Sequence, residues 1–459
     1  MSLIKSISGI RGTIGGKPGD NLTPLDVVRF TAAYGSLVKD KVGQPKVVVG
    51  RDGRISGPMV HTLVVQTLVG LGIEVIDLGL STTPTVEFAV MNEQAAGGII
   101  LTASHNPRQW NALKLLNEKG EFLSAADGQA VLQRAEQAAI EFAGVDELGK
   151  IRYDNSYLDK HIKAILNYPL VNASAIAAAG FSVVVDGINS SGALFVPALL
   201  RALGVKDVIV LNEAMTGDFA HNPEPLPEYL TGLSEAVVKH RAHLGIAVDP
   251  DVDRLCFVNE NGSLFGEEYT LVAVADHVLC SRPGNTVSNM SSTAALKVLT
   301  RNFGGEYHAA AVGEVNVVSK MKAVNAVIGG EGNGGIIVPD FHYGRDALIG
   351  IGLFLTLLAD RKISMTALRA TYPDFHISKN KIDLLLGMEL GPILQTIGKK
   401  YADRPQLTED GLRIEFGDDW VHLRGSNTEP IIRVYAESRS PEAAQQLARQ
   451  LLQDIQGLV

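Results

Sequence analysis

Three short apolar segments that end in glycine or aspartate constrain the fold of this chain more than any other feature. Their sequences are Lys46-Val-Val-Val-Gly50, Phe181-Ser-Val-Val-Val-Asp186 and Leu244-Gly-Ile-Ala-Val-Asp249. An apolar run without polar alternation is typical of a strand that is buried on both faces, as in a parallel sheet covered by helices. The sequence therefore predicts an α/β fold in which one type of strand-and-turn unit occurs three times.

Helical patterns separate these strands, which is what parallel strands with right-handed crossovers require. The first helix is expected to follow Thr23, a capping residue, with Pro24 at its first position. Further helices are expected over residues 56–71, 82–92, 192–203, 268–280 and 293–303. Further strands are expected over residues 73–78, 97–103, 208–211, 285–290 and 326–329.

The last ninety residues have a different pattern. Leu412, Ile414 and Phe416 alternate with polar residues, as in a half-buried antiparallel strand. Strands over 420–423 and 431–436 and an amphipathic helix after Ser440 complete a small α+β unit. Because 459 residues exceed the ~250–300 that one core supports, we predict four domains, over 1–150, 151–256, 257–370 and 371–459.

Charge and cysteine content exclude several functional classes. The chain has 41 Lys and Arg against 50 Asp and Glu, a net charge of −9, which argues against nucleic acid or an anionic membrane as its main partner. No signal-peptide core and no run of ~18 apolar residues is present, so a cytoplasmic protein is expected. Cys256 and Cys280 lack metal-type spacing, and the eleven histidines form no His-x-x-x-His pair on a predicted helix.

The first motif that could carry chemistry is Thr102-Ala-Ser-His-Asn-Pro107. It follows a predicted strand, at the carboxyl edge where parallel sheets place their ligands. Ser104 and His105 could be a nucleophile and its base, but the Gly-x-Ser-x-Gly elbow of hydrolases is missing, and neighbours in a strand point to opposite faces. An Asn-Pro turn with an incidental serine is the alternative.

The second motif places Asp249, Asp251 and Asp253 at alternate positions after a strand. Three carboxylates so close together repel one another unless a cation joins them, and oxygen ligands suit Mg²⁺. An EF-hand is excluded because Pro250 and Arg254 stand at its second and sixth positions and a strand precedes the loop. The sequence therefore predicts a site for a hard divalent cation.

Two later loops are rich in glycine or arginine. Gly329-Gly-Glu-Gly-Asn-Gly-Gly335 lacks the Gly-Lys-Ser/Thr of a nucleotide loop. Its Glu331 and Asn333 suit sugar hydroxyls better than phosphate, although a flexible glycine-rich turn is an equal alternative. Arg424-Gly-Ser-Asn-Thr-Glu-Pro430, with Arg433 close by, has the donors of a phosphate cradle, although a polar hairpin tip is an equal alternative. The basic turns 8–12 and 50–54 are uninformative by themselves.

The order of these four loops, one in each predicted domain, resembles the α-D-phosphohexomutases, which include phosphoglucomutase/phosphomannomutase and phosphoglucosamine mutase. The resemblance implies three related α/β domains with mixed, mostly parallel sheets around a central cleft, and a smaller C-terminal α+β domain. It implies transfer of a phosphoryl group between the 1- and 6-positions of a hexosamine or hexose phosphate. The route is a phosphoserine enzyme and a bisphosphorylated sugar intermediate.

The resemblance also implies roles for individual residues. Ser104 would be the phosphorylated serine, and its phosphate would complete the Mg²⁺ ligands Asp249, Asp251 and Asp253. The other catalytic residues would be Lys114 as general acid or base, with Arg11, His105 and Arg254 around the transfer site. Glu331 and Asn333 would bind the sugar hydroxyls. The phosphate that does not react would be anchored by Arg424, Ser426, Asn427, Thr428 and Arg433.

One Mg²⁺ per chain, a sugar bisphosphate as activator and a phosphosugar as small-molecule partner follow from the same resemblance, for a monomer or homodimer. Asn333, where several members have serine, and the acidic Glu314 favour glucosamine phosphate over glucose or mannose phosphate. A phosphatase with an aspartyl nucleophile would leave Ser104 without a role. A non-catalytic phosphosugar-binding protein would not need both Ser104 and Lys114.

Overall fold

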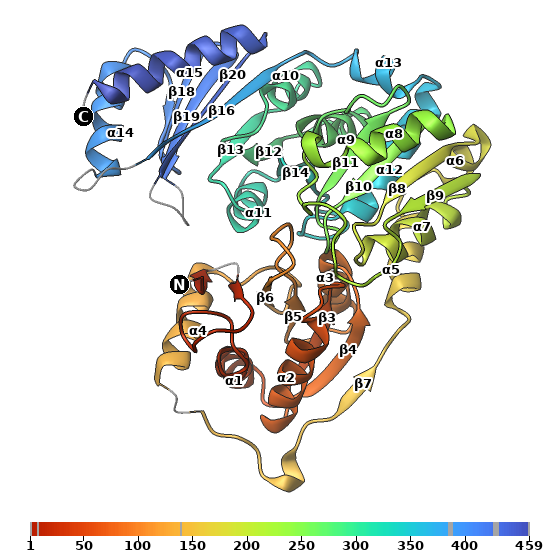
Figure 1. The fold of residues 1–459 in the computed structure, drawn as a ribbon, viewed down its shortest axis with the longest axis vertical. Coiled ribbons are helices and arrows are strands. Elements are labelled where there is room, and N and C mark those ends of the chain that lie inside the picture. The colour runs from red at the N-terminus through yellow and green to blue at the C-terminus, as the bar shows by residue number, and fades with distance from the viewer. Residues whose placement is uncertain (1, 7–8, 138–139, 384–388, 426–430, 458–459) are drawn as a thin grey trace. The chain divides into compact units, whose positions relative to one another are not determined.

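The computed structural model describes residues 2–6, 9–137, 140–383, 389–425 and 431–457 (Figure 1). Ser426, Asn427 and Thr428, which the sequence places in the phosphate cradle, lie outside the described residues. The chain forms two compact units. Unit 1 consists of Met1–Thr270 and Asn333–Thr366, and unit 2 of Leu271–Gly332 and Ala367–Val459. The four predicted domain ranges stay a prediction.

The first sheet of unit 1 has seven strands in the order β1-β2-β6-β5-β3-β4-β7. Their bounds are β1 (Ile4–Ser6), β2 (Gly9–Thr13), β3 (Lys46–Arg51), β4 (Glu74–Leu80), β5 (Gly97–Leu101), β6 (Trp110–Leu116) and β7 (Ile151–Tyr153). Strand β3 is parallel to β4 and β5, whereas β6 is antiparallel to both β5 and β2. The sheet is therefore mixed.

Helices cover both faces of this sheet. On one face, α1 (Pro24–Lys41), α2 (Gly57–Gly70) and α4 (Ala125–Gln137) enclose a core that includes Val47 and Val49. The other face carries α3 (Thr83–Asn92), which packs against β3 and β5, where Gly50 and Gly98 leave room for its valines. Thr23 begins α1 as predicted, through reciprocal capping bonds with Asp26.

The second sheet of unit 1 has the order β11-β10-β8-β9. The strands are β8 (Ser182–Asp186), β9 (Asp207–Leu211), β10 (Leu244–Val248) and β11 (Leu255–Asn259), and only β11 is antiparallel to its neighbour. Unit 1 also contains the helices α5 (Tyr157–Leu166), α6 (Ala173–Ala179), α7 (Gly192–Ala202), α8 (Thr231–His240) and α12 (Ala347–Arg361) and the short strand β15 (Gly335–Ile337). Helix α12 is buried from Ala347 to Ala359 and contacts α5, α6 and α7.

Unit 2 contains a parallel arrangement followed by an antiparallel sheet. In the first, β12 (Thr286–Asn289) pairs with both β13 (Tyr307–Ala310) and β14 (Ile328–Glu331), and α10 (Ala294–Asn302) and α11 (Glu314–Ala323) pack nearby. The antiparallel sheet has the order β16-β20-β19-β18-β17. Its strands are β16 (His376–Asp383), β17 (Gln406–Leu407), β18 (Leu412–Phe416), β19 (Asp419–Gly425) and β20 (Ile431–Ser438).

Helices α14 (Leu390–Lys400) and α15 (Pro441–Gln456) lie together on one face of that antiparallel sheet (Figure 1). Two further helices, α9 (Glu267–Ser281) and α13 (Met365–Arg369), each contain the residue at which one unit ends and the other begins. Short 3₁₀ turns lie at Val145–Glu147 and Pro227–Tyr229. Of the helices in the described part of the chain, none combines the length and apolar character that a membrane crossing requires.

Most expected elements agree with the structure to within one or two residues at each end, and two differences concern the site. The strand expected over 97–103 ends at Leu101, because the chain turns there and Ser104 adopts a left-handed backbone with φ of 49°. The strand expected over 326–329 is β14, which extends to Glu331. Strand β6, which carries Lys114, has no expected counterpart in the sequence patterns, since its polar and apolar residues do not alternate cleanly.

Candidate active site

Ser104 and Asp249 are brought into contact by the two sheets of unit 1. Ser104 follows β5 and Asp249 follows β10, so each stands beyond the carboxyl end of a parallel strand. The Ser104 hydroxyl donates a hydrogen bond to Asp249 Oδ2 over 2.6 Å, and the His105 Nδ1 lies 3.3 Å from the same hydroxyl. A hydroxyl that could act as a nucleophile is thus in direct contact with Asp249, the first carboxylate of the aspartate motif.

Arg54 holds the loop that carries Ser104. Its buried guanidinium pairs with Asp52 Oδ2 over 3.0 Å, and Asp52 also accepts a hydrogen bond from Thr102. The same guanidinium donates to four backbone carbonyl oxygens, those of Ser104, Asn106, Pro107 and Trp110. Ser104 has an unfavourable left-handed backbone, and these hydrogen bonds from Arg54 stabilise the turn that contains it.

Arg54→Lys is therefore expected to lower the free energy of unfolding by about 2–3 kcal/mol, because an ammonium cannot make the guanidinium's divergent hydrogen bonds. Arg51→Lys is the matched control. Arg51 is only partly buried and donates one bond, to the Asp52 carbonyl, so its loss should cost less than about 1 kcal/mol. Urea unfolding measures the free energy of unfolding of both variants. Equal losses in the two would contradict the stabilisation of the Ser104 loop by Arg54.

The three aspartates form a closely spaced, fully buried group. Asp249, Asp251 and Asp253 each contribute one carboxylate oxygen to a set whose members lie within 4.8 Å of one another. The Oδ1 atoms of Asp251 and Asp253 are buried without a hydrogen-bond partner, whereas Asp249 Oδ1 accepts two backbone amides. Three closely spaced buried carboxylates, two of which keep an oxygen without a partner, fit a hard cation such as Mg²⁺.

Cationic side chains surround this acidic group. Lys114 Nζ lies 2.7 Å from Asp251 Oδ2 and 3.2 Å from Asp253 Oδ2, and Arg345 donates to Asp253 Oδ2 over 2.7 Å. Arg254 Nε lies 4.0 Å from Asp249 Oδ2. Thr83 completes the arrangement with a hydrogen bond to Asp251 Oδ2.

These contacts shift the pKa values of the group in opposite directions. Burial raises the pKa of Asp249 well above its ordinary value, and the charges of Asp253 and Asp251 add to the effect. Burial also acts against ionised Asp253, but Arg345 and Lys114 outweigh it and lower its pKa. Burial alone would lower the pKa of Lys114, yet Asp251 and Asp253 raise it, so this lysine is an ammonium.

Two other residues predicted for the transfer site lie in the same unit. Burial lowers the pKa of His105 well below its ordinary value, and the nearby Arg254 contributes, so the imidazole is neutral. Arg11, on β2, is partly buried and lies close enough to His105 to lower its pKa as well. Asn333 also belongs to unit 1, where its Oδ1 accepts from the Gly335 amide over 3.3 Å.

The remaining predicted site residues that the structure describes belong to unit 2. Glu331 ends β14, and its Oε1 accepts from Asn289 Nδ2 and from the Gly313 amide, each over 3.0 Å. Arg424 on β19 is the cross-strand partner of Arg433 on β20, so the two guanidinium-bearing residues are neighbours. Two arginines side by side suit an anion with several oxygens, such as phosphate.

Asp410 orients Arg424. Its carboxylate lies 3.4 Å from Arg424 Nε and accepts the Val312 amide over 3.1 Å, while its carbonyl oxygen is 2.6 Å from His422 Nε2. His422 Nδ1 in turn lies 2.9 Å from Ser291 Oγ. The loops that follow β12 and β13 are therefore joined to the C-terminal sheet beside Arg424.

Three residues that contact the Ser104 loop or the aspartate group could not be recognised from the sequence: Arg54, Thr83 and Arg345. Arg54 lies in the basic turn 50–54, which is uninformative by itself, and Thr83 lies at the start of the helix expected over 82–92. A signal for Arg345 exists in hindsight, because Gly-Arg-Asp occurs at both 50–52 and 344–346. The first copy lies at the end of β3 and the second in the loop before α12, so the repeat joins two segments that are far apart in the chain.

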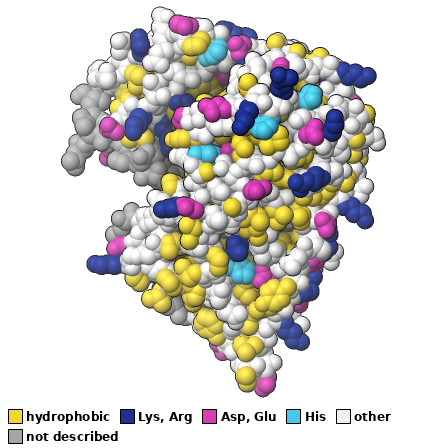
Figure 2. Space-filling model, turned by 45° about the vertical axis from the view of Figure 1, so that its right-hand side comes forward, with side chains coloured by type: hydrophobic (Ala, Val, Ile, Leu, Met, Phe, Trp, Pro, Cys, Tyr) yellow, Lys and Arg dark blue, Asp and Glu magenta, His cyan; other side chains and the backbone are white. Residues whose placement is uncertain are grey.

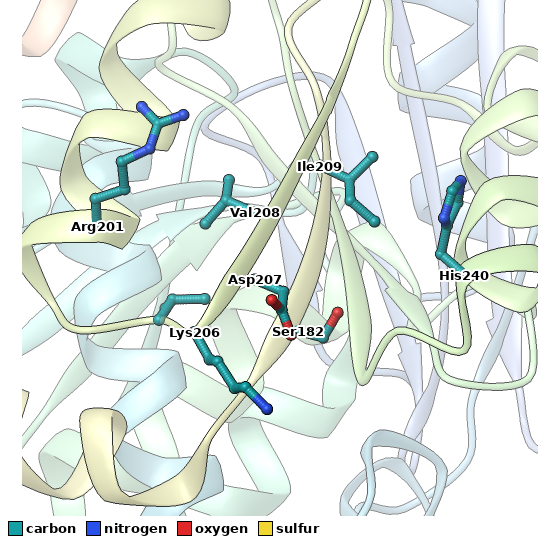
Figure 3. Close-up of a pocket in the computed structure, with 8 residues that line it drawn as sticks. Ser182, Arg201, Lys206, Asp207, Val208, Ile209 and His240 are labelled. Carbon is teal, nitrogen blue, oxygen red and sulfur yellow. The ribbon is translucent and has the colours of Figure 1, made fainter.

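A hollow of about 580 Å³ lies elsewhere in unit 1, over strand β9 (Figure 3). Figure 3 shows Arg201 and His240 on opposite sides of the strand, with Ser182 and Asp207 between them. Ser182 and Asp207 begin β8 and β9, so this hollow lies at the amino ends of the strands. Asp249 follows the carboxyl end of the parallel strand β10, so the hollow is separate from the site.

The surface does not carry one dominant charge on the face shown in Figure 2. Among the residues drawn in colour there, lysines and arginines (dark blue) alternate with aspartates and glutamates (magenta). This mixed distribution agrees with the net charge of −9. It is unlike the continuous basic surface that non-specific nucleic-acid binding uses.

Comparison with known domain families gives four matches in chain order, all to the phosphoglucomutase/phosphomannomutase family. The α/β/α domains I, II and III match residues 3–141, 159–262 and 267–375, and the C-terminal domain matches residues 386–453. A Thermococcus kodakarensis protein named phosphoglucomutase/phosphomannomutase is 34% identical over 445 residues, 95% of this chain and 96% of its own.

Two further similarities cover nearly the whole chain. A probable phosphoglucosamine mutase of Methanopyrus kandleri is 32% identical over 445 residues, which is 96% of this chain and 95% of its own. The crystal structure of a phosphoglucomutase/phosphomannomutase family protein from Burkholderia thailandensis superposes with a TM-score of 0.84 at 26% identity, covering 99% and 98% of the two chains. The predicted fold class, three related α/β domains and a C-terminal α+β domain, is confirmed.

Proposed function

This chain belongs to the phosphoglucomutase/phosphomannomutase family of α-D-phosphohexomutases, and we propose that it is an intramolecular phosphotransferase that isomerises hexosamine or hexose phosphates. The phosphoryl group would move between the 1- and 6-positions of the sugar, with Ser104 as its carrier and a bisphosphorylated sugar as the intermediate. One observation carries this proposal: the Ser104 hydroxyl donates to Asp249 at the edge of the aspartate group.

The chemistry requires a balanced exchange of protons. When phosphoserine transfers its phosphoryl group, the phosphorus–Ser104 oxygen bond breaks and a bond from phosphorus to a sugar oxygen forms. The sugar hydroxyl loses a proton and Ser104 gains one. Asp249, whose carboxylate already contacts the Ser104 oxygen, can exchange that proton. Lys114 would carry the proton of the sugar in both directions. As the amine, once bound Mg²⁺ offsets the carboxylate charges that raise its pKa, it would take the proton of the attacking hydroxyl, and as the ammonium it would return that proton to the departing sugar oxygen.

Phosphoryl transfer depends on charge neutralisation more than on covalent chemistry. Asp249, Asp251 and Asp253 would hold one Mg²⁺, and this ion would neutralise charge on the transferring group. Arg11 and Arg254 would contact the phosphoryl oxygens, and Arg345 keeps Asp253 ionised. Neutral His105 would donate or accept one hydrogen bond beside Ser104 without adding charge.

Substrate binding is assigned to residues outside the aspartate group. Glu331 and Asn333 would bind sugar hydroxyls, and Arg424, Ser426, Asn427, Thr428 and Arg433 would anchor the phosphate that does not react. The cross-strand pairing of Arg424 with Arg433 supports this assignment. A single anchor that binds the 1-phosphate in one orientation and the 6-phosphate in the other allows the intermediate to reorient.

Arg424→Ala is expected to raise KM about tenfold or more for both the 1-phosphate and the 6-phosphate substrate, because both orientations use the same guanidinium. The phosphate on Ser104 should be unchanged. Arg439→Ala is the matched control, since Arg439 is exposed and pairs with Asp418 near the same sheet. Steady-state kinetics in both directions measures the effect, and weakening of only one substrate would contradict a shared anchor.

Glucosamine phosphate is the substrate that the residues favour. Glu314 begins α11 directly after Gly313, whose amide donates to Glu331, so an acidic residue is next in the chain to one that contacts the proposed sugar-binding residue. An acidic neighbour suits the amino group of glucosamine. The relative from Methanopyrus kandleri bears the name of that activity, whereas the Thermococcus kodakarensis relative supports glucose or mannose phosphate as the second candidate.

A coupled assay with glucosamine, glucose and mannose 1-phosphates, with catalytic sugar bisphosphate as activator, tests the substrate class. We expect the highest kcat/KM for glucosamine 1-phosphate and a lower preference for it in Glu314→Gln. An equal or higher kcat/KM for the two neutral sugars would contradict the preference. We further propose a cytoplasmic monomer or homodimer that binds neither nucleic acid nor membranes.

A further inference from the structure

Two histidines and an aspartate form a second buried cluster in unit 1, outside the proposed active site. His161 lies on α5, His342 lies in the loop between β15 and α12, and Asp346 is the residue that caps α12. All three side chains are at most 2% exposed. None of them has a role in the proposed reaction, so the cluster requires a separate explanation.

Three atoms of the cluster that could bind a metal ion lie close together. The Nε2 atoms of His161 and His342 each lie 3.1 Å from the same oxygen, Asp346 Oδ2. One ligand atom from each residue lies within 4.8 Å of the other two. With bonds of ~2.0–2.1 Å to nitrogen and oxygen, a tetrahedral Zn²⁺ separates its ligand atoms by ~3.3 Å, close to the distances found here.

The opposite atoms of His161 and Asp346 are hydrogen-bonded to neighbours, and that of His342 faces a carboxylate. His161 Nδ1 lies 2.9 Å from Thr85 Oγ1, and His342 Nδ1 lies 3.5 Å from Glu87 Oε2. Asp346 Oδ1 accepts the amides of Leu348 and Ile349, over 2.8 and 3.3 Å. Ligand residues in metal sites are held in this way, with the second ring nitrogen directed at an oxygen.

Proton placement favours a cation over a simple hydrogen-bonded network. If His342 were neutral and donated from Nε2 to Asp346, its Nδ1 lone pair would face the Glu87 carboxylate, so two acceptors would oppose each other. That Nδ1 is buried and makes no hydrogen bond. A metal ion on Nε2 leaves the proton on Nδ1, where it points towards Glu87.

We propose that His161, His342 and Asp346 bind one divalent transition-metal ion of the Zn²⁺ class. Two imidazoles and one carboxylate favour such an ion over Mg²⁺, which takes mainly oxygen ligands. The ion would tie α5 to the start of α12, and Arg345, next to Asp346, would be steadied against Asp253.

The test uses the full-length protein, stripped with a chelator and then equilibrated with Zn²⁺ or Co²⁺ in excess Mg²⁺. The wild type is expected to retain about one equivalent after desalting, measured by inductively coupled plasma mass spectrometry. Its Co²⁺ form should show the visible d–d absorption of a four-coordinate ion, and Zn²⁺ should raise its Tm.

Asp346→Asn and His342→Gln should each retain less than about a tenth of the wild-type metal. The matched control is His240→Gln, since His240 is an exposed histidine on α8 and should not affect retention. Asp251→Asn should also retain the Zn²⁺, because Asp251 belongs to the group of three aspartates and not to this cluster. If stripped wild type neither retains Zn²⁺ nor gives the Co²⁺ bands, or if the cluster variants bind as much metal as wild type, the proposal is wrong. This outcome does not depend on the mutase activity.

Discussion

Ser104→Ala is expected to lower kcat by about 10³-fold or more while the Michaelis constant changes less than about threefold, because the variant cannot carry a phosphoryl group. The Ser104 oxygen is the atom to which phosphorus would bond, and among the residues that the structure describes it is the one hydroxyl that donates to Asp249 Oδ2. The arginine anchor for the substrate phosphate would be intact. Initial rates with glucosamine 1-phosphate and added sugar bisphosphate measure the effect.

Ser191→Ala is the control for this substitution. Ser191 is also buried in unit 1, and its hydroxyl donates to the Ser81 carbonyl over 2.6 Å. Its removal costs one internal hydrogen bond, about 1 kcal/mol of stability, and should leave kcat within about threefold. Turnover in Ser104→Ala comparable to that of Ser191→Ala would mean that Ser104 is not the phosphoryl carrier.

Asp251→Asn is expected to lower Mg²⁺-dependent turnover by at least about 100-fold, more than is typical for residues that only support a metal ligand. The amide is a weaker, neutral ligand, and it also removes the carboxylate that holds Lys114 Nζ at 2.7 Å. The protein should remain folded, because the substitution removes one of three mutually repelling charges. Turnover measured over a range of Mg²⁺ concentrations, together with Tm, separates these two effects.

The matched control is Asp186→Asn, which makes the same change at the end of the neighbouring parallel strand β8. Asp186 is buried but hydrogen-bonds Asn212, the Ile188 amide and His221, with no second carboxylate in its group. Its Mg²⁺ dependence should match that of the wild type. A normal Mg²⁺ response in Asp251→Asn would show that the aspartates do not serve the ion.

Local patterns were sufficient to predict the strands that position the site. Val47–Val49, Val183–Val185 and Ile246–Val248 are buried strand residues because continuous apolar segments fit only a sheet covered on both faces. Each was expected to end in a turn, and the turn after β10 does carry the aspartate group. The capping of α1 by Thr23 was equally local, since the cap and its partner Asp26 are three residues apart.

Contacts between distant segments could not be predicted in the same way. Arg345 reaches Asp253, and Arg54 reaches the Ser104 loop, only after β3, β5 and β10 have taken their places in two sheets. A pair of histidines at helical spacing would be visible in the sequence, but His161 and His342 are not of that kind. They are far apart in the chain and meet only because α5 packs against α12. Such pairings depend on the order of packed elements, which single-sequence periodicity does not specify.

The intact mass of freshly purified wild-type protein tests the central claim most directly. We predict a species that carries one phosphate, which peptide mapping locates on Ser104 and which is absent from Ser104→Ala. Incubation with excess glucosamine 6-phosphate should remove this phosphate as sugar bisphosphate forms, and added bisphosphate should restore it. Full turnover by protein that never carries phosphate on Ser104, even after incubation with sugar bisphosphate, would contradict the account.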